Sequence, residues 1–251
     1  DRDFSDARDT GEGIARQAFD IIRERRSIAG DLYPFTITDS RVVYNGPDDL
    51  NARYLLPLSL TISHAYNLNT PQDPKLYLEE YVNQVLRQRG VTSTNFGKIG
   101  RNAGDFRVAL NTATDNIYLP STPSRAAYPQ DAQDAGVDVL SHYVFSKADN
   151  RPGRLVLIGQ VTCGKSDSWS EKMKEPTPNK WSNLMGMETH PLPFLAVPHH
   201  ISEPTFYHLA EEYSKCIILD RMRLIFYEGE LTIEEPDRMV AVLRNNDVTI
   251  R

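Results

Sequence analysis

The sequence predicts an α/β fold built on one mixed (α+β) sheet, and three observations indicate it. A strongly amphipathic helix is expected at 74–90, where apolar residues recur at helical spacing and Gly90 stands at the end. Two β-rich segments, 136–145 and 154–163, are joined by the turn-forming SKADNRPG and predict a β-hairpin. After them, strand-like and helical segments alternate, which is typical of a layered α/β structure.

The other elements follow from the same periodicities. Further helices are expected at 1–31, 52–66, 104–119, 166–175, 204–214 and 237–246. Further strands are expected in LYPFTITDSRVVY and at 194–200 and 215–227. The Pro-rich segment TPQDPK at 70–75 breaks the pattern and marks a boundary. We therefore expect an N-terminal helical, regulatory region at 1–70, a core at 71–227 and a C-terminal helical extension at 228–251.

Composition and charge limit the classes of protein to which the chain can belong. The chain carries 28 Lys and Arg against 34 Asp and Glu, a net charge of −6. This charge argues against coating nucleic acid with the whole surface, but it leaves room for a local basic groove. No stretch of about 18 apolar residues predicts a membrane span. Cys163 and Cys216 form neither a disulfide framework nor a cysteine zinc site, and no secretory signal is visible, so a cytoplasmic, reduced setting is expected.

Polar residues interrupt both apolar segments of the predicted hairpin. Asp138 and Gln160 are each 11 residues from residue 149, which lies inside the predicted turn. Opposed residues of a hairpin are equally far from its turn, so the two are expected to be cross-strand neighbours on one face of the sheet. Thr162 is expected on the same face as Gln160. Because the strand around Gln160 is otherwise apolar, burying a carboxylate and an amide there is costly unless something binds them. A divalent cation takes both kinds of oxygen as ligands, so the pair predicts a cation site.

An ordered set of motifs resembles a known family. The helix LEEYVNQVLRQRG at 78–90, GVDV at 136–139 and GQ at 159–160 are together similar to the Mrr-like branch of the PD-(D/E)XK nuclease superfamily, in which the second acidic residue is often Gln. The resemblance extends over about 75–225. It implies a restriction-endonuclease-like core with helices on both faces of the sheet, and it implies a metal-dependent endodeoxyribonuclease activity.

The resemblance also implies roles for individual residues. Asp138 would be the principal ligand of Mg²⁺ (or Mn²⁺), and Gln160 the second, through its amide oxygen. Glu79 or Glu80 would supply the carboxylate of the opening helix, and Asp134 is a further ligand candidate. The cation would activate water and stabilise charge on the phosphate during hydrolysis of DNA.

The sequence departs from the family at Thr162, where the resemblance implies a lysine. A hydroxyl group cannot supply the fixed positive charge that stabilises an attacking hydroxide and a phosphate. Lys165 and Lys172 are the candidates to replace it, and Lys172 is preferred because it shares one helical face with Trp169. A basic run over 87–107 either contacts phosphates or forms a solvated face, and both interpretations stay open. Its members are Arg87, Arg89, Lys98, Arg101 and Arg107.

A competing motif overlaps the second strand of the hairpin. GQVTCGKS at 159–166 satisfies the phosphate-binding P-loop pattern G-x-x-x-x-G-K-[ST], and KCIILD at 215–220 offers a strand that ends in Asp. A P-loop leads directly into a long helix with an apolar face, whereas the segment after Ser166 is short, polar and ended by Pro176. A P-loop nucleotide-binding ATPase is therefore kept as an alternative function.

The resulting prediction is a Mg²⁺-dependent DNA endonuclease, or the nuclease subunit of a larger machine, in prokaryotic antiviral defence. The acidic balance favours a protein partner that brings the DNA, such as an ATPase or a sensor subunit, and residues 1–70 are the expected docking region. An oligomer is compatible with the sequence, and no membrane contact is expected. A catalytically inactive nuclease-like subunit that serves as a binding or scaffold module is the other alternative.

Overall fold

The computed structural model describes residues 2–39, 41–45, 49–120, 135–149, 151–212, 215–233 and 236–245. The chain divides into two compact units, Asp1–Leu56 and Pro57–Arg251, which are described separately. Their boundary falls inside one helix, α2 (Asp49–Ala65), whereas the sequence places a boundary at residue 70. No helix in the described ranges combines the length and the apolar character that crossing a membrane requires.

The first unit is a long helix followed by a small antiparallel hairpin. Its elements are α1 (Arg2–Ala29), the 3₁₀ helix η1 (Gly30–Leu32), β1 (Phe35–Thr38), β2 (Arg41–Tyr44) and the start of α2. Gly30 ends α1 with a φ of 57°, a left-handed conformation that glycine adopts without strain. Tyr33 is buried and packs edge-on against Phe35 and Tyr54, with ring centroids 5.6 and 4.8 Å away. The segment LYPFTITDSRVVY, expected to be extended, thus contains a two-stranded hairpin.

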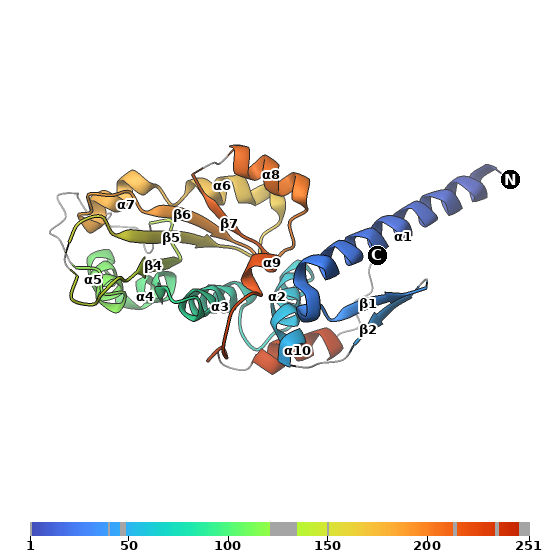
Figure 1. The fold of residues 1–251 in the computed structure, drawn as a ribbon, viewed down its shortest axis with the longest axis horizontal. Helices are drawn as coiled ribbons and strands as arrows, with labels where there is room; N and C mark the ends of the chain where they lie inside the picture. Colours follow the sequence, from blue (N-terminus) through green and yellow to red (C-terminus); the bar gives the residue numbers. More distant parts are fainter. Residues whose placement is uncertain are drawn as a thin grey trace. The chain divides into compact units, whose positions relative to one another are not determined.

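The second unit contains a five-stranded mixed sheet, which confirms the predicted α/β class (Figure 1). After α2 its elements are α3 (Pro74–Gln88), β3 (Thr92–Asn95), α4 (Phe96–Ala103), α5 (Phe106–Asn116), β4 (Val139–Tyr143), β5 (Leu155–Val161), η2 (Ser166–Ser168), α6 (Trp169–Lys174), α7 (Pro178–Met185), β6 (Leu192–Ala196), α8 (Glu203–Glu212), β7 (Ile217–Leu219), α9 (Arg221–Leu224) and α10 (Pro236–Asn245). The strand order is β3-β4-β5-β6-β7; the first three are antiparallel and the last three parallel. Helices form the two parallel crossovers, and Figure 1 shows α3 on one side of the sheet and α6, α7 and α8 on the other.

Two hydrophobic clusters hold the helices to this sheet. The first joins β4 and β5 to α4, α5 and α7, and it contains Trp181, whose ring centroid lies 5.4 Å from that of Phe96 and 6.1 Å from that of Phe106. The second joins α6 and α8 to β6 and β7 through Trp169 and Leu195, among others. Because Phe96 is the first residue of α4, the first cluster fixes the start of that helix.

The sequence does not predict β3, α4 or α7. β3 has the polar sequence TSTN and is still largely buried, and its Ser93 hydroxyl lies 2.8 Å from that of Ser141 on β4. α4 begins after Asn95, whose side chain accepts a hydrogen bond from the Lys98 N–H at 2.8 Å. β3 therefore depends on a polar partner that is 48 residues away in the chain, whereas α4 has a local cap.

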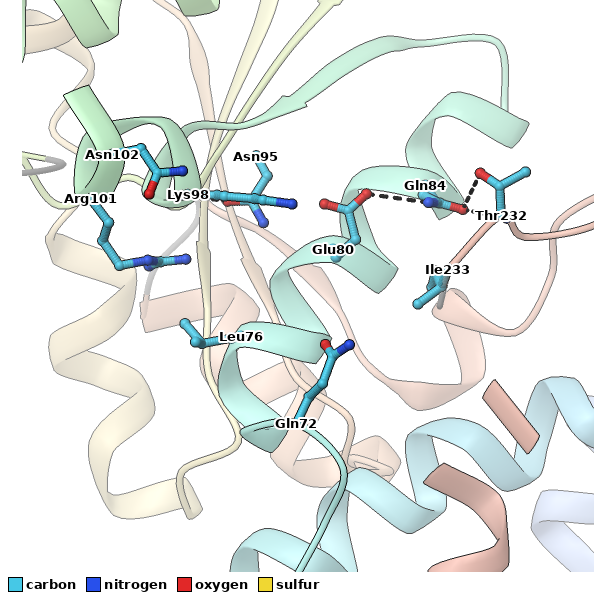
Figure 2. Close-up of a pocket in the computed structure, with 10 residues that line it drawn as sticks. All are labelled: Gln72, Leu76, Glu80, Gln84, Asn95, Lys98, Arg101, Asn102, Thr232 and Ile233. Carbon is cyan, nitrogen blue, oxygen red and sulfur yellow. Dashed lines mark hydrogen bonds between the residues drawn. The ribbon is translucent and has the colours of Figure 1, made fainter. Parts of the chain in front are cut away.

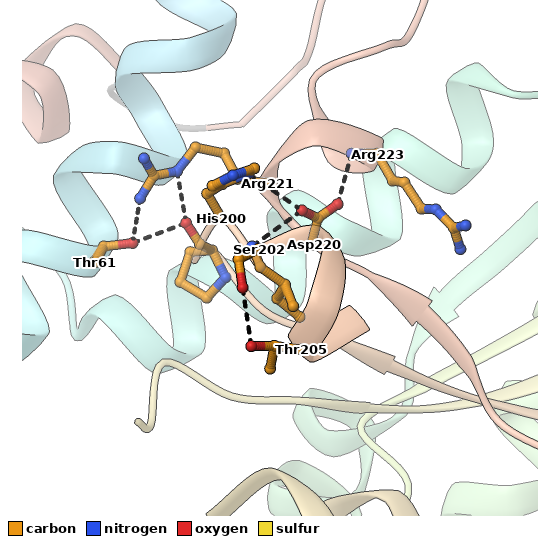
Figure 3. A network of polar contacts seen from close by, with 9 residues as sticks. Thr61, His200, Ser202, Thr205, Asp220, Arg221 and Arg223 are labelled. Atoms are coloured by element: carbon orange, nitrogen blue, oxygen red, sulfur yellow. Dashed lines mark hydrogen bonds and ion pairs between the residues drawn. The ribbon is translucent and has the colours of Figure 1, made fainter. Parts of the chain in front are cut away.

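A buried polar network ends β7 (Figure 3). The prediction of one strand over 215–227 is wrong beyond Leu219, because the chain forms β7 up to that residue and α9 after Asp220. The physical reason is Asp220, which caps α9 by accepting a hydrogen bond from the Arg223 N–H at 3.0 Å. Arg221 is buried and donates from Nη2 to the Thr61 hydroxyl at 3.0 Å and from Nε to a backbone carbonyl beyond β6 at 2.8 Å. The network thereby joins α2, the end of β6 and α9.

Burial raises the pKa of the Asp220 carboxyl, although the backbone N–H groups bonded to it act in the opposite direction. A raised pKa means that the folded protein binds this proton more tightly than the unfolded chain does. The contribution of Asp220 to stability is therefore full below the unfolded pKa and is lost as pH rises through the folded pKa. Asp220→Asn keeps a capping oxygen without the ionisation, so we expect its free energy of unfolding to rise relative to the wild type as pH increases from acidic to neutral.

Urea unfolding at a series of pH values measures this difference. Asp105→Asn, the same change at the exposed cap of α5, is the control for altering a capping carboxylate. The expectation would be contradicted if the wild type and Asp220→Asn differed in free energy of unfolding by the same amount at every pH.

Candidate active site

Asp138 and Gln160 lie at the open end of the β4–β5 hairpin. β4 and β5 pair with Val139 opposite Gly159, which confirms the register that the sequence predicts. Beyond this pair the Asp138 N–H donates to the Gly159 carbonyl at 2.7 Å, and Asp138 Oδ2 accepts a hydrogen bond from the Val161 N–H at 2.7 Å. Asp138 is 9% exposed and Gln160 is 3% exposed. The Asp138 carboxylate is thus buried and fixed across the end of β5.

Glu79 reaches the same place from α3. Asp73 caps this helix and Pro74 starts it, and its buried face carries Glu79 among apolar residues. Glu79 Oε2 and Oε1 accept hydrogen bonds from Arg101 Nη2 and Nη1 at 2.6 and 3.1 Å, which makes a bidentate ion pair. The Glu79 side chain is 8% exposed and that of Arg101 is 35% exposed. The carboxylate is therefore buried, and the guanidinium group covers it from the more open side.

Gly97, in the first turn of α4, marks the point where these groups meet. Its N–H donates to the Asp138 carbonyl at 2.9 Å. A Cβ placed there would lie 3.1 Å from Glu79 Oε2 and from Arg101 Nη1, and 3.5 Å from Asp138 Oδ1. One position is therefore in contact with both carboxylates and with the guanidinium group. The glycine lets α3, α4 and the start of β4 bring their charged groups together.

The chemistry of these donors fits a hard divalent cation. Glu79 and Asp138 offer carboxylate oxygens and Gln160 offers an amide oxygen, which are ligands that Mg²⁺ and Mn²⁺ accept. Within the described ranges, no group of three or more His, Cys, Asp and Glu residues could hold a metal ion. A cation bound by Glu79 and Asp138 would therefore need neutral oxygens, such as the amide oxygen of Gln160 or those of water molecules, as its remaining ligands. Asp134 lies outside the described residues. A cation here must displace Arg101 from Glu79 or share Glu79 with it.

Glu80, the second helix glutamate proposed from the sequence, faces a groove (Figure 2). It accepts hydrogen bonds from Gln84 Nε2 at 3.2 Å and from Asn83 Nδ2 at 3.4 Å. The groove has a volume of about 450 Å³ and is lined by Gln72, Leu76, Glu80, Gln84, Asn95, Lys98, Arg101, Asn102, Thr232 and Ile233. Arg101 therefore belongs both to this groove and to the carboxylate site, whereas Glu80 belongs to the groove.

The two lysines proposed from the sequence, Lys165 and Lys172, have no contact with Glu79 or Asp138 among those that the structure gives for the described residues. Lys172 on α6 pairs with Glu175, with Nζ 2.8 Å from Oε1, and Lys165 is exposed in the turn after β5. The cation that contacts Glu79 is Arg101, which sequence reasoning did not assign to the site. Arg101 is 22 residues from Glu79 in the chain, and the available signal was its place in the basic run.

The segment 159–166, which matches the P-loop pattern, is a strand followed by a tight turn. The Thr162 N–H donates to a backbone carbonyl of β6 at 3.0 Å, and the Gly164 N–H donates to the Thr162 hydroxyl at 2.9 Å. A phosphate cradle needs such N–H groups free and a helix directly behind them, but only η2 and the six-residue α6 follow. Gly159 has a packing role instead, because a Cβ there would overlap the ring of Phe194. These features argue against the ATPase alternative.

No protein-family model, no curated protein and no solved structure matches the chain.

Proposed function

We propose that the chain is a metal-dependent nuclease that hydrolyses DNA phosphodiester bonds at the site formed by Glu79, Asp138 and Gln160. The observation that carries the proposal is the convergence at Gly97, where carboxylates from α3 and from the start of β4 lie within 3.5 Å of one position. The order of elements supports it as well. A helix that bears Glu, a hairpin that bears Asp and then Gln, and a helical crossover to a parallel strand are compatible with a restriction-endonuclease-like core.

Each residue has a defined part in the proposed reaction. Mg²⁺ at this site would activate water and neutralise charge on the phosphate. Asp138 is oriented in advance, because a backbone N–H of β5 holds one of its oxygens while the other is directed at the Gly97 position. Gln160 adds a neutral oxygen donor from the adjacent strand. Arg101 and Lys98 supply fixed positive charge for the phosphate.

The proposed setting is a nuclease subunit of a prokaryotic defence system. The net charge of −6 supports a partner that brings the DNA, such as an ATPase or a sensor subunit, because an acidic protein gains little from non-specific attraction to DNA. Residues 1–70 are the proposed docking region for that partner.

A catalytically inactive subunit that serves as a binding or scaffold module is the second candidate. The bidentate Arg101–Glu79 pair favours it, because the guanidinium group already neutralises a carboxylate that the cation needs. The hydroxyl of Thr162, where the resembling family has a lysine, favours it too. The two candidates differ in whether the chain cleaves DNA when a cation is bound.

Binding of Mn²⁺ and cleavage of plasmid DNA test the proposal together. We expect the wild type to bind Mn²⁺ in titration calorimetry and to cleave plasmid with Mg²⁺ or Mn²⁺ but not with EDTA. Glu79→Gln removes a negatively charged ligand, so we expect its Mn²⁺ affinity to fall by at least about tenfold, or 1.4 kcal/mol. Glu171→Gln, a change of an exposed α6 glutamate paired with Lys174, is the matched control and should leave the affinity unchanged.

The calorimetric measurement does not require the proposed partner. A wild type that binds no Mn²⁺ would remove the proposal. Mn²⁺ binding that Glu79→Gln weakens, without cleavage of any DNA tested, would favour the inactive subunit instead.

A further inference from the structure

We infer that Arg101 serves two ligands in turn: the Glu79 carboxylate in the cation-free protein, and a phosphate of the nucleic acid once a divalent cation occupies the carboxylate site. The inference rests on the proposed function and adds to it a phosphate-binding subsite formed by Lys98 and Arg101. Because one side chain serves both sites, cation binding and DNA binding strengthen each other.

The Arg101–Glu79 pair occupies the oxygens that a cation needs. Both Glu79 oxygens accept hydrogen bonds from the guanidinium group, at 2.6 and 3.1 Å, and Asp138 Oδ1 faces the same position. A buried carboxylate without a counter-ion is strongly unfavourable, so Arg101 supplies in the cation-free protein the charge that a cation supplies later. A divalent cation in contact with Glu79 repels the guanidinium group and competes for the same oxygens. The two cannot both bind Glu79 at full strength.

The groove beside α3 offers Arg101 a second position. Figure 2 shows its guanidinium group directed into this groove of about 450 Å³, together with the Lys98 side chain. Lys98 precedes Arg101 by three residues on α4, so the two cations share one helical face. Asn95 and Asn102 add amide groups to the lining. Closely spaced cations with amide donors are the groups that bind nucleic-acid phosphates.

The exchange of Arg101 couples the two sites. While Arg101 is paired with Glu79, the charges that remain in the groove are those of Lys98 and Glu80, which are opposite in sign. Release of Arg101 adds one positive charge to the groove and raises its affinity for phosphate. Linkage is reciprocal, so a phosphate that holds Arg101 raises the affinity for the cation by the same factor. Couplings of this kind typically amount to about 5- to 150-fold.

Mn²⁺ affinity in the absence of DNA shows whether Arg101 competes with the cation for Glu79 or only holds the Glu79 side chain in place. Arg101→Gln removes the competitor, so we expect Mn²⁺ affinity to rise by about fivefold or more. A residue that merely held Glu79 in place would give the opposite sign. Arg101→Lys keeps the charge but not the bidentate pair, and we expect an affinity between those of the wild type and Arg101→Gln. The lysine variant tests the same point if the glutamine variant does not fold.

DNA affinity tests the other half of the exchange. Fluorescence anisotropy with a short labelled DNA duplex in Ca²⁺ is expected to show weaker binding for Lys98→Gln and for Arg101→Gln. Each change should lower the slope of log affinity against log salt by about one unit, as loss of one phosphate contact requires. Lys98→Gln should change Mn²⁺ affinity less than Arg101→Gln does. Arg151→Gln, which breaks an exposed pair with Asp149 at the hairpin turn, is the control for both measurements.

An unchanged or lower Mn²⁺ affinity in Arg101→Gln overturns the inference, and so does a DNA affinity that neither groove variant alters. Both results differ from failure of the proposed function, in which the wild type itself binds no Mn²⁺. That failure would remove the inference as well, whereas a wild type that binds Mn²⁺ through Glu79 leaves the proposed function standing on its own.

Discussion

Asp138→Asn is expected to lower the rate of DNA cleavage by at least about a thousandfold, or roughly 4 kcal/mol of transition-state stabilisation. Asparagine has the shape of aspartate and can still accept the hydrogen bond from the Val161 N–H. It lacks the negative charge, so a cation would keep one carboxylate, that of Glu79, which Arg101 also holds. Single-turnover cleavage of plasmid DNA in Mg²⁺ measures the rate.

The control for this change lies on the same hairpin. Asp149→Asn alters an aspartate at the turn, where it pairs with Arg151 at 2.9 Å, and it should leave the rate unchanged. Urea unfolding of Asp138→Asn checks that a lower rate does not reflect a smaller folded fraction. Cleavage by Asp138→Asn within about tenfold of the wild-type rate would contradict the assignment of Asp138 as a cation ligand.

Trp181→Ala is expected to lower the free energy of unfolding by about 3–5 kcal/mol. The side chain is 0% exposed and packs against the rings of Phe96 and Phe106, which also contact each other. Removing the indole leaves a cavity that the helices on either side cannot close without moving. Because Phe96 begins α4, the change also loosens the helix that carries Gly97 and Arg101.

Urea unfolding at neutral pH measures this loss. Phe145→Ala is the matched control, since this aromatic side chain is 71% exposed and its removal should change stability by no more than about 0.5 kcal/mol. A loss below about 1 kcal/mol for Trp181→Ala would show that the first hydrophobic cluster does not depend on this side chain.

The hairpin illustrates what could be predicted from the sequence. Opposed residues of an antiparallel pair are related through the turn, so the turn-forming segment between the strands fixed which residues face each other. The observed pairing of Val139 with Gly159 follows that prediction, and it brings Asp138 beside the strand that carries Gln160. Helices with a clear apolar stripe were predictable for the same reason, as α3 shows.

β3 and α4 illustrate what could not be predicted. TSTN has the composition of a loop, yet three of its four residues are buried because β4 supplies partners such as the Ser141 hydroxyl. FGKIGRNA contains two glycines, which oppose a helix, and it is helical because Asn95 caps it and Phe96 is anchored by Trp181. The sequence pattern therefore does not indicate the helix that positions Arg101, and it points to Lys165 and Lys172 for the positive charge.

The sequence by itself determined the α/β class and the register of the hairpin, because these depend on residue periodicity and on fixed distances along a strand. Only the tertiary structure decided that Glu79, and not Glu80, meets Asp138. Successive residues of a helix differ by about 100° in direction, and the packing of α3 selects which of them is buried. The tertiary structure also decided that Arg101 is the partner of Glu79, because that pair is formed by two helices whose contact no local pattern encodes.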